Sequence, residues 1–185
     1  MIGWSVLGTL SPETALARPD LLAAPVAAAL KALDPADAAR VGVAEIDPAL
    51  ADTAAFCAAY GAPMDGSANC VVVAGRRGEV VRYAACLVLA TTRADVNGLV
   101  RRRLDARKAS FAPMDDAVAL TGMEYGGITP LGLPDDWPLL VDAAVAAAPA
   151  VVVGSGLRGS KLALPGALSA ALPGAEVVEG LARPA

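Results

Sequence analysis

Short apolar runs separated by glycine, proline or charge recur along the whole chain. Where these runs alternate or are rich in β-branched residues, they predict strands. The predicted strands are 40–46, 69–74, 79–90, 107–112, 139–141, 151–153, 161–164 and an edge strand at 175–178.

Other apolar runs are rich in alanine and predict helices. These are 20–33, 49–60, 95–104, 114–121, a short segment between 141 and 151, and 166–172. Asp20 is the expected N-cap of the first helix, with Pro25 in its first turn. Gly61 and Gly122 are expected to end the second and fourth helices.

Two of the strands are predicted to form a hairpin through residues 75–78, whereas the glycine- and proline-rich stretch 122–138 predicts a loop. Helices and strands interleave irregularly, without a clean βαβ series. The pattern therefore indicates an α+β (mixed α/β) fold, with a mixed sheet and packed helices. We expect residues 1–185 to form a single domain.

Composition narrows the chemistry. The chain has 185 residues, 56% of them hydrophobic, and no histidine, which excludes a Ser-His-Asp triad, a Cys-His dyad and any histidine metal ligand. Three widely spaced cysteines, Cys57, Cys70 and Cys86, indicate reduced thiols in a cytoplasmic protein. No secretory leader or membrane span is expected.

Charge is unevenly distributed. The net charge is −4, yet residues 67–112 hold nine of the fifteen Lys and Arg residues and only three of the nineteen Asp and Glu residues. Such a basic segment can hold a polyanion, although a solvated face is the other interpretation. The candidates for contact with such a polyanion are Arg101, Arg102, Arg103, Arg107 and Lys108.

A GxGxxG motif at 154–159 follows a predicted strand and suggests a dinucleotide site at first sight. That site requires a helix directly after the motif, whereas Lys161 to Leu164 predicts a strand. Only 26 residues follow Gly159, too few to complete a doubly wound sheet. A dinucleotide site is therefore not expected.

The second glycine motif is the run from Thr121 to Pro130. Adjacent glycines followed by proline give a tight turn whose backbone N–H groups can face a ligand. Such turns can cradle an anion or a developing oxyanion, and they also occur as plain surface turns.

Taken in order, these segments resemble the YbaK/ProRS-associated editing-domain family. The resemblance runs from Asp47 to Val178. It includes Ala68-Asn69-Cys70-Val71 opening a strand, Ala112-Pro113 opening a helix, TGMEYGGITPLG at 121–132, and GSGLRG at 154–159. It implies a mixed, partly barrel-like sheet surrounded by helices.

The resemblance also implies an aminoacyl-adenosine pocket lined by the two glycine turns. The expected catalytic positions are Asn69, Gly126, Gly127 and Lys161. Those expected to bind substrate are Ile128, Thr129, Pro130, Asp142, Ser155, Gly156 and Arg158.

This chain departs from the family pattern at three positions. Asn69 stands where a lysine is usual, Ala44 where a tyrosine or similar residue is frequent, and Lys161 where a carboxylate is frequent. Lys161 either supplies the missing cation from across the pocket or is an exposed lysine at a strand end.

The expected function is therefore that of a trans-acting aminoacyl-tRNA deacylase. An aminoacyl ester is already activated, so positioning of the carbonyl and of water matters more than a strong base. The alternative is a binding module for tRNA, a nucleotide or another small molecule, without turnover. The expected partners are the tRNA acceptor end and an aminoacyl-tRNA synthetase, with no cofactor, metal or membrane.

Overall fold

The computed structural model describes residues 3–185. Its helices are α1 (Ala24–Ala32), α2 (Pro35–Ala38), α3 (Thr53–Tyr60), α4 (Arg101–Arg103), α5 (Met114–Thr121), α6 (Ala143–Ala147) and α7 (Gly166–Ala170). Its strands are β1 (Glu13–Thr14), β2 (Gly42–Glu45), β3 (Ala68–Arg77), β4 (Val80–Leu89), β5 (Thr92–Ala94), β6 (Lys108–Phe111), β7 (Leu139–Asp142), β8 (Val151–Gly154), β9 (Ser160–Leu164), β10 (Ala175–Val178) and β11 (Ala182–Pro184).

The strands form two main sheets. One has the order β1-β2-β9-β8 and is antiparallel throughout. The other has the order β10-β7-β4-β3-β6, in which the pairs β10-β7 and β7-β4 are parallel. A two-stranded ribbon of β11 and β5 lies beside them.

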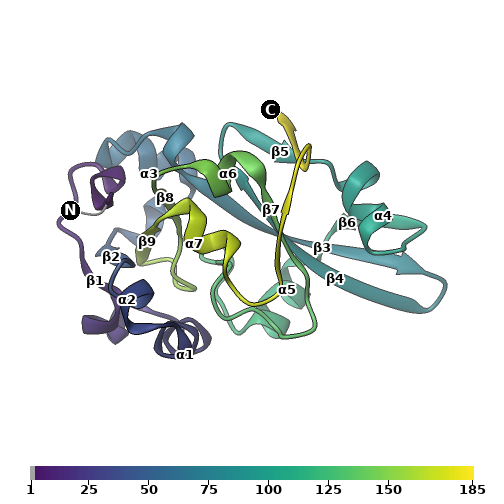
Figure 1. Cartoon of the computed structure of the whole chain (residues 1–185), viewed down its shortest axis with the longest axis horizontal. Helices are drawn as coiled ribbons and strands as arrows, with labels where there is room; N and C mark the ends of the chain where they lie inside the picture. The colour runs from purple at the N-terminus through teal and green to yellow at the C-terminus, as the bar shows by residue number, and fades with distance from the viewer. Residues whose placement is uncertain (1–2) are drawn as a thin grey trace.

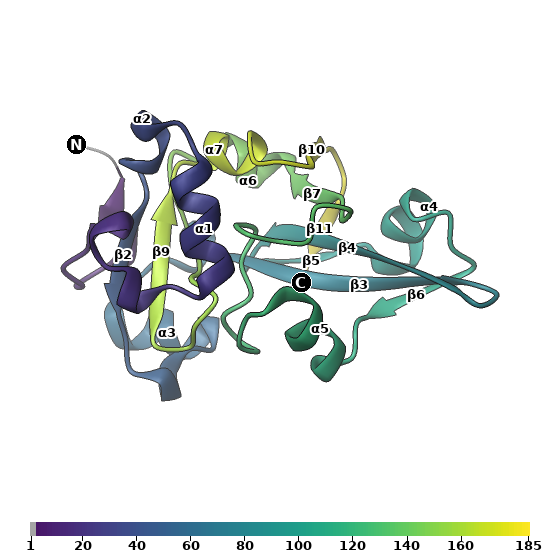
Figure 2. The same cartoon turned by 90° about the horizontal axis from the view of Figure 1, so that it is seen from below.

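The two sheets meet where β3 begins. A parallel bridge pairs Ser67 with Val152, so the sheets join into a partly closed arrangement with helices around it (Figure 1). The long β3–β4 hairpin runs from this junction to the end of the molecule far from the N-terminus (Figures 1 and 2). The predicted α+β fold with a mixed sheet is confirmed.

Apolar packing connects distant parts of the sequence. One buried cluster combines Val26 and Leu30 of α1 with Met123 of the loop and Val153 of β8. Packing of α1 therefore helps to place both the loop and the strand that precedes the second glycine turn. No helix among residues 3–185 is long and apolar enough to cross a membrane.

Several predicted elements need correction at their ends. The first helix begins at Ala24 with Ala23 as N-cap, because Asp20 lies in a separate 3₁₀ turn and pairs with Arg18. The second begins at Thr53, because Asp52 accepts hydrogen bonds from the next helical amides and caps it there.

The first strand of the hairpin is longer than predicted and the turn is shorter: β3 continues to Arg77 and β4 begins at Val80, so only Gly78 and Glu79 turn the chain. Residues 96–103 form a π-helical turn followed by α4, in place of one regular helix. The predicted loop at 122–138, the edge strand at 175–178 and the strand after the GxGxxG motif are confirmed.

Candidate functional site

A cavity of about 470 Å³ opens where the two sheets meet. Its walls come from the start of β3, the residues at the start of α3, the loop after α5, the end of β8 and the start of β9. Lining residues from β3 and its approach are Ser67, Ala68, Asn69, Cys70, Val71 and Val72. The loop contributes Tyr125, Gly126 and Ile128.

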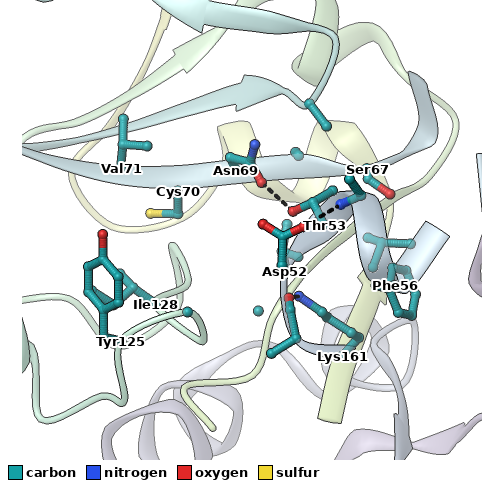
Figure 3. Close-up of a pocket in the computed structure, with 18 of the residues that line it drawn as sticks. Asp52, Thr53, Phe56, Ser67, Asn69, Cys70, Val71, Tyr125, Ile128 and Lys161 are labelled. Atoms are coloured by element: carbon teal, nitrogen blue, oxygen red, sulfur yellow. Dashed lines mark hydrogen bonds between the residues drawn. The ribbon is translucent and has the colours of Figure 1, made fainter. Parts of the chain in front are cut away.

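Polar groups gather at one end of the cavity (Figure 3). Asp52 projects there from the N-terminus of α3, where its carboxylate accepts hydrogen bonds from the amides of Ala54 and Ala55. The hydroxyl of Thr53 donates to Oδ1 of Asn69 at 2.7 Å. The amide nitrogen of Asn69 has no recorded hydrogen bond within residues 3–185, and it is therefore available as a donor.

Lys161 is the cation at this polar end. It is only 7% exposed, its Nζ donates to the carbonyl oxygen of Ala51 at 2.8 Å, and it lies 5.5 Å from the centroid of the Phe56 ring. Burial lowers the pKa of Lys161, with Cys57 and Asp52 acting in the opposite direction. Lys161 is thus a buried wall residue and not an exposed lysine at a strand end.

The other end of the cavity is apolar. Figure 3 shows Tyr125 and Ile128 facing Cys70 across it. Burial raises the pKa of the Cys70 thiol far above its ordinary value, so this sulfur is protonated at neutral pH. Cys70 therefore acts as an apolar wall and not as a nucleophile.

The backbone of β3 also faces the cavity at Cys70. In an antiparallel sheet alternate residues bond to opposite neighbours. The carbonyl of Val72 accepts from Ala112 on the β6 side, so the even-numbered residues point to that side. The β3–β6 pairing ends at Val73 and Phe111, which leaves the N–H and C=O of Cys70 unpaired within residues 3–185.

The two glycine turns lie against each other. The amide of Gly156 donates to the carbonyl oxygen of Gly127 at 2.7 Å, and the amide of Glu124 donates to the carbonyl oxygen of Gly156 at 2.9 Å. A Cβ atom on Gly127 would lie 2.7 Å from the carbonyl oxygen of Leu157. Glycine at position 127 is therefore required by this close approach.

Within the loop, individual amides differ in what they can offer. The amide of Gly127 already donates to the carbonyl of Glu124 at 2.9 Å. Those of Gly126 and Ile128 have no recorded acceptor in the described part of the chain, and both residues line the cavity. If loop amides polarise a carbonyl, Gly126 and Ile128 are the available donors, and Gly127 shapes the turn.

Arg158 joins the loop to the opposite wall. Its guanidinium donates to the carbonyl oxygens of Tyr125 at 3.2 Å and Pro48 at 3.1 Å, and its backbone amide donates to the Glu124 carboxylate. Positively charged and hydrogen-bonded to both sides, Arg158 holds the loop beside the start of α3.

The remaining predicted site residues lie outside the cavity lining. Thr129 and Pro130 are buried behind the loop, and the Thr129 hydroxyl has no hydrogen-bond partner within residues 3–185. Ser155 and Gly156 are buried beneath the turn, where the Ser155 hydroxyl pairs with that of Ser160.

Asp142 is also placed elsewhere. Its carboxylate caps α6 through the amide of Ala144 and accepts from the amide of Ala182, so it ties β7 to the C-terminal ribbon. The basic residues Arg101, Arg102, Arg103, Arg107 and Lys108 lie on α4, on β6 and just before β6, beside the hairpin and away from the polar end of the cavity (Figure 2).

Asp52, Thr53, Phe56 and Tyr125 line the cavity although sequence reasoning did not select them. The signal for the first two was an Asp-Thr pair opening a helix, which also reads as an ordinary N-cap. Nothing in the local pattern distinguishes Phe56 from any other core aromatic.

Comparison with known proteins identifies the family to which this chain belongs. The model of the aminoacyl-tRNA editing domain matches residues 47–170, two thirds of the chain. The chain belongs to the aminoacyl-tRNA editing domain family. The match includes Asn69, both glycine turns and Lys161, so the cavity of this editing domain lies within the family region.

Solved structures share the fold of this editing domain. A scaffold protein from a study of computational epitope grafting matches with a TM-score of 0.69 and 24% identity, covering 85% of this chain and 95% of that one. A proposed trans-editing enzyme for prolyl-tRNA synthetase matches with a TM-score of 0.68 and 23% identity, covering 85% and 94%. The hypothetical protein APE2540 matches with a TM-score of 0.62 and 21% identity over 72% and 85%. No curated protein matches.

Proposed function

We propose that this editing domain hydrolyses the ester bond of mischarged aminoacyl-tRNA in trans. The observation that carries the proposal is the cavity itself. It places the available amides of Gly126 and Ile128, the donor of Asn69 and the buried amine of Lys161 around one space, within the region that defines the family. The whole chain as one editing domain is part of this proposal, supported by the core that α1 shares with the loop.

In the proposed reaction the loop amides polarise the ester carbonyl. Water attacks the carbonyl carbon, the tetrahedral intermediate collapses, and the bond to the ribose oxygen breaks. That oxygen takes up a proton, so the products are the free amino acid and uncharged tRNA. No histidine is present to carry the proton, and the proposal gives this task to the substrate's neighbouring ribose hydroxyl.

The contacts at the polar end support the roles proposed for its residues. Lys161 is anchored on the carbonyl of Ala51 and supplies positive charge where a family lysine is replaced by Asn69. The Asn69 amide donates to the substrate while its oxygen is held by Thr53. The available backbone of Cys70 is a further donor and acceptor for the aminoacyl group or ribose.

The basic residues of α4 and β6 are proposed to hold the tRNA acceptor end, with a synthetase as a further partner. The support for this is charge: Arg101, Arg102, Arg107 and Lys108 have no carboxylate within 4.0 Å in residues 3–185. Arg103 differs, because it pairs with Glu176.

A deacylation screen tests the proposal directly. tRNAs charged with alanine, serine, cysteine, threonine and proline are incubated with the protein, and release of the amino acid is followed. We expect release from at least one, and a tenfold or larger loss for Lys161→Ala against no change for Lys31→Ala on the surface of α1. Binding of tRNA without release from any of them would favour the non-catalytic module.

A further inference from the structure

Two aromatic side chains stand apart from the other aromatic residues of the chain. There are seven, all within residues 3–185, and five of them pack against buried clusters: Trp4, Phe56, Tyr60, Tyr83 and Trp137. Phe111 is 61% exposed and Tyr125 is 54% exposed. Both line the same cavity.

The two rings flank the mouth from opposite sides of the sheet edge. Phe111 is the register partner of Val73, which packs with Val100 and Leu104 on the face that α4 covers. Tyr125 lies on the other face, below Cys70, as Figure 3 shows. Between them lies the unpaired edge of β3.

Charge around the mouth favours a nucleic acid. Lys108 and its register partner Arg76 continue from Phe111 along β6 and β3, and neither has a carboxylate within 4.0 Å in the described residues. Asp115 and Asp116 lie on the first turn of α5, directly after Phe111. These carboxylates disfavour phosphates over α5, so phosphates are expected along the Arg76 and Lys108 side.

We infer that Phe111 and Tyr125 are stacking platforms for the unpaired bases of an RNA 3′ end at the cavity mouth. The inference rests on the proposed function and adds how the substrate's single strand is held. Sequence-specific and nonspecific binding of single strands both use aromatic rings for base stacking, beside cations for the backbone. Exposed rings beside Arg76 and Lys108 provide both a stacking surface and cations. A set of basic residues that is merely solvated would need no exposed aromatic ring beside it.

Binding to uncharged RNA tests the inference apart from catalysis. The probe is an RNA hairpin with a short single-stranded 3′ overhang, compared with the same hairpin whose overhang nucleotides are abasic. Removing the bases keeps every phosphate, so we expect weaker binding by roughly 5- to 100-fold from lost stacking. Phe111→Ala and Tyr125→Ala should each weaken binding to the normal overhang within that range and leave binding to the abasic hairpin unchanged.

Conservative variants and a matched control make the result specific. Phe111→Tyr and Tyr125→Phe should bind like the parent, because both keep a ring. Val177→Ala removes an exposed apolar side chain on β10, and it should also bind like the parent. Circular dichroism melts establish that each variant is folded.

Three outcomes would overturn the inference. They are equal binding of normal and abasic overhangs, alanine variants that bind like Val177→Ala, and loss of binding in the ring-retaining variants. The first two would show that Phe111 and Tyr125 are exposed rings on which no base stacks. RNA binding that follows these rules without ester hydrolysis would instead remove the proposed deacylase and leave the stacking surface intact.

Discussion

Ala44 and Lys161 face each other across the β2–β9 pair, as register partners in adjacent antiparallel strands. On its other side Lys161 is paired with Gly154. The lysine therefore stands between two small residues, which leaves room for its long side chain to pass near the Phe56 ring and reach the carbonyl of Ala51. The two positions where we expect departures from the family pattern, Ala44 and Lys161, are thus neighbours in space.

Enlarging residue 44 should displace Lys161. Ala44 is 3% exposed, so Ala44→Leu overpacks the site and costs about 1–3 kcal/mol of unfolding free energy. We expect the amine to leave the Ala51 carbonyl and deacylation to fall about as far as in Lys161→Ala. Ala59→Leu on the exposed side of α3 is the control. A folded Ala44→Leu variant with full activity would contradict the packing argument.

The buried amine also predicts how stability changes with pH. Burial lowers the Lys161 pKa from its ordinary 10.5, so between the two values the unfolded chain binds more protons than the folded one. The unfolding free energy contributed by Lys161 therefore rises with pH through that window and is constant below it. Over this pH range the urea unfolding midpoint should rise less in Lys161→Met than in the parent protein, whereas Lys31→Met should keep the parent slope. Parallel plots of midpoint against pH for all three proteins would show that the Lys161 amine is not desolvated.

The contact between the glycine turns can be tested with two glycines of the same region. Gly127→Ala places a Cβ 2.7 Å from the Leu157 carbonyl oxygen, whereas at Gly159 the nearest atom lies at 3.7 Å. We expect Gly127→Ala to lose about 1–3 kcal/mol of stability and most of its deacylation, and Gly159→Ala to lose little of either. Urea unfolding and the charged-tRNA assay provide the measurements. Equal stability and equal deacylation in the two variants would show that the close contact between Gly127 and Leu157 is not required.

The basic surface beside the hairpin predicts salt-dependent binding. Arg102→Glu combined with Arg107→Glu should weaken tRNA binding and reduce the slope of log affinity against log salt, because fewer counterions are released. Lys31→Glu combined with Arg40→Glu, both in the N-terminal third, changes the net charge by the same amount and is the control. Salt-independent binding in the parent protein would identify these arginines as a solvated face.

Cys70 offers a test of the nucleophile. Because burial keeps its thiol protonated, we expect Cys70→Ala to retain deacylation within a few-fold, and the parent thiol to react slowly with iodoacetamide at neutral pH. Loss of deacylation in a folded Cys70→Ala variant would show that the Cys70 thiol takes part in the reaction.

Periodicity located most strands and helices, because strands such as β3 and β4 are long and rich in β-branched residues. It failed where tertiary contacts decide. Asp20 has the composition of an N-cap but pairs with Arg18, and β5 and β11 are too short to carry a pattern and exist because they pair with each other.

The site residues likewise fall into those that the sequence predicted and those that depend on tertiary contacts. Asn69, Gly126, Ile128 and Lys161 were selected from motifs and do line the cavity. Asp142 was expected at the site from the family resemblance, but its carboxylate caps α6 and accepts from the amide of Ala182. The roles of Asp52, of Arg158 as a link between two loops, and of the unpaired Cys70 backbone depend on which segments meet in space, and local sequence does not encode that meeting.

The length of β3 fixes the distance between the cavity and the tip of the hairpin. Cys70 at the cavity and Arg77 at the hairpin tip belong to one strand, seven residues or roughly 23 Å apart. A stacked strand of nucleic acid places one phosphate about every 3.4 Å, so about seven phosphates span that distance. An oligonucleotide with fewer phosphates can fill the cavity without reaching Arg77. If nucleic acid follows β3, affinity should therefore increase with length only until the strand reaches the tip of the hairpin.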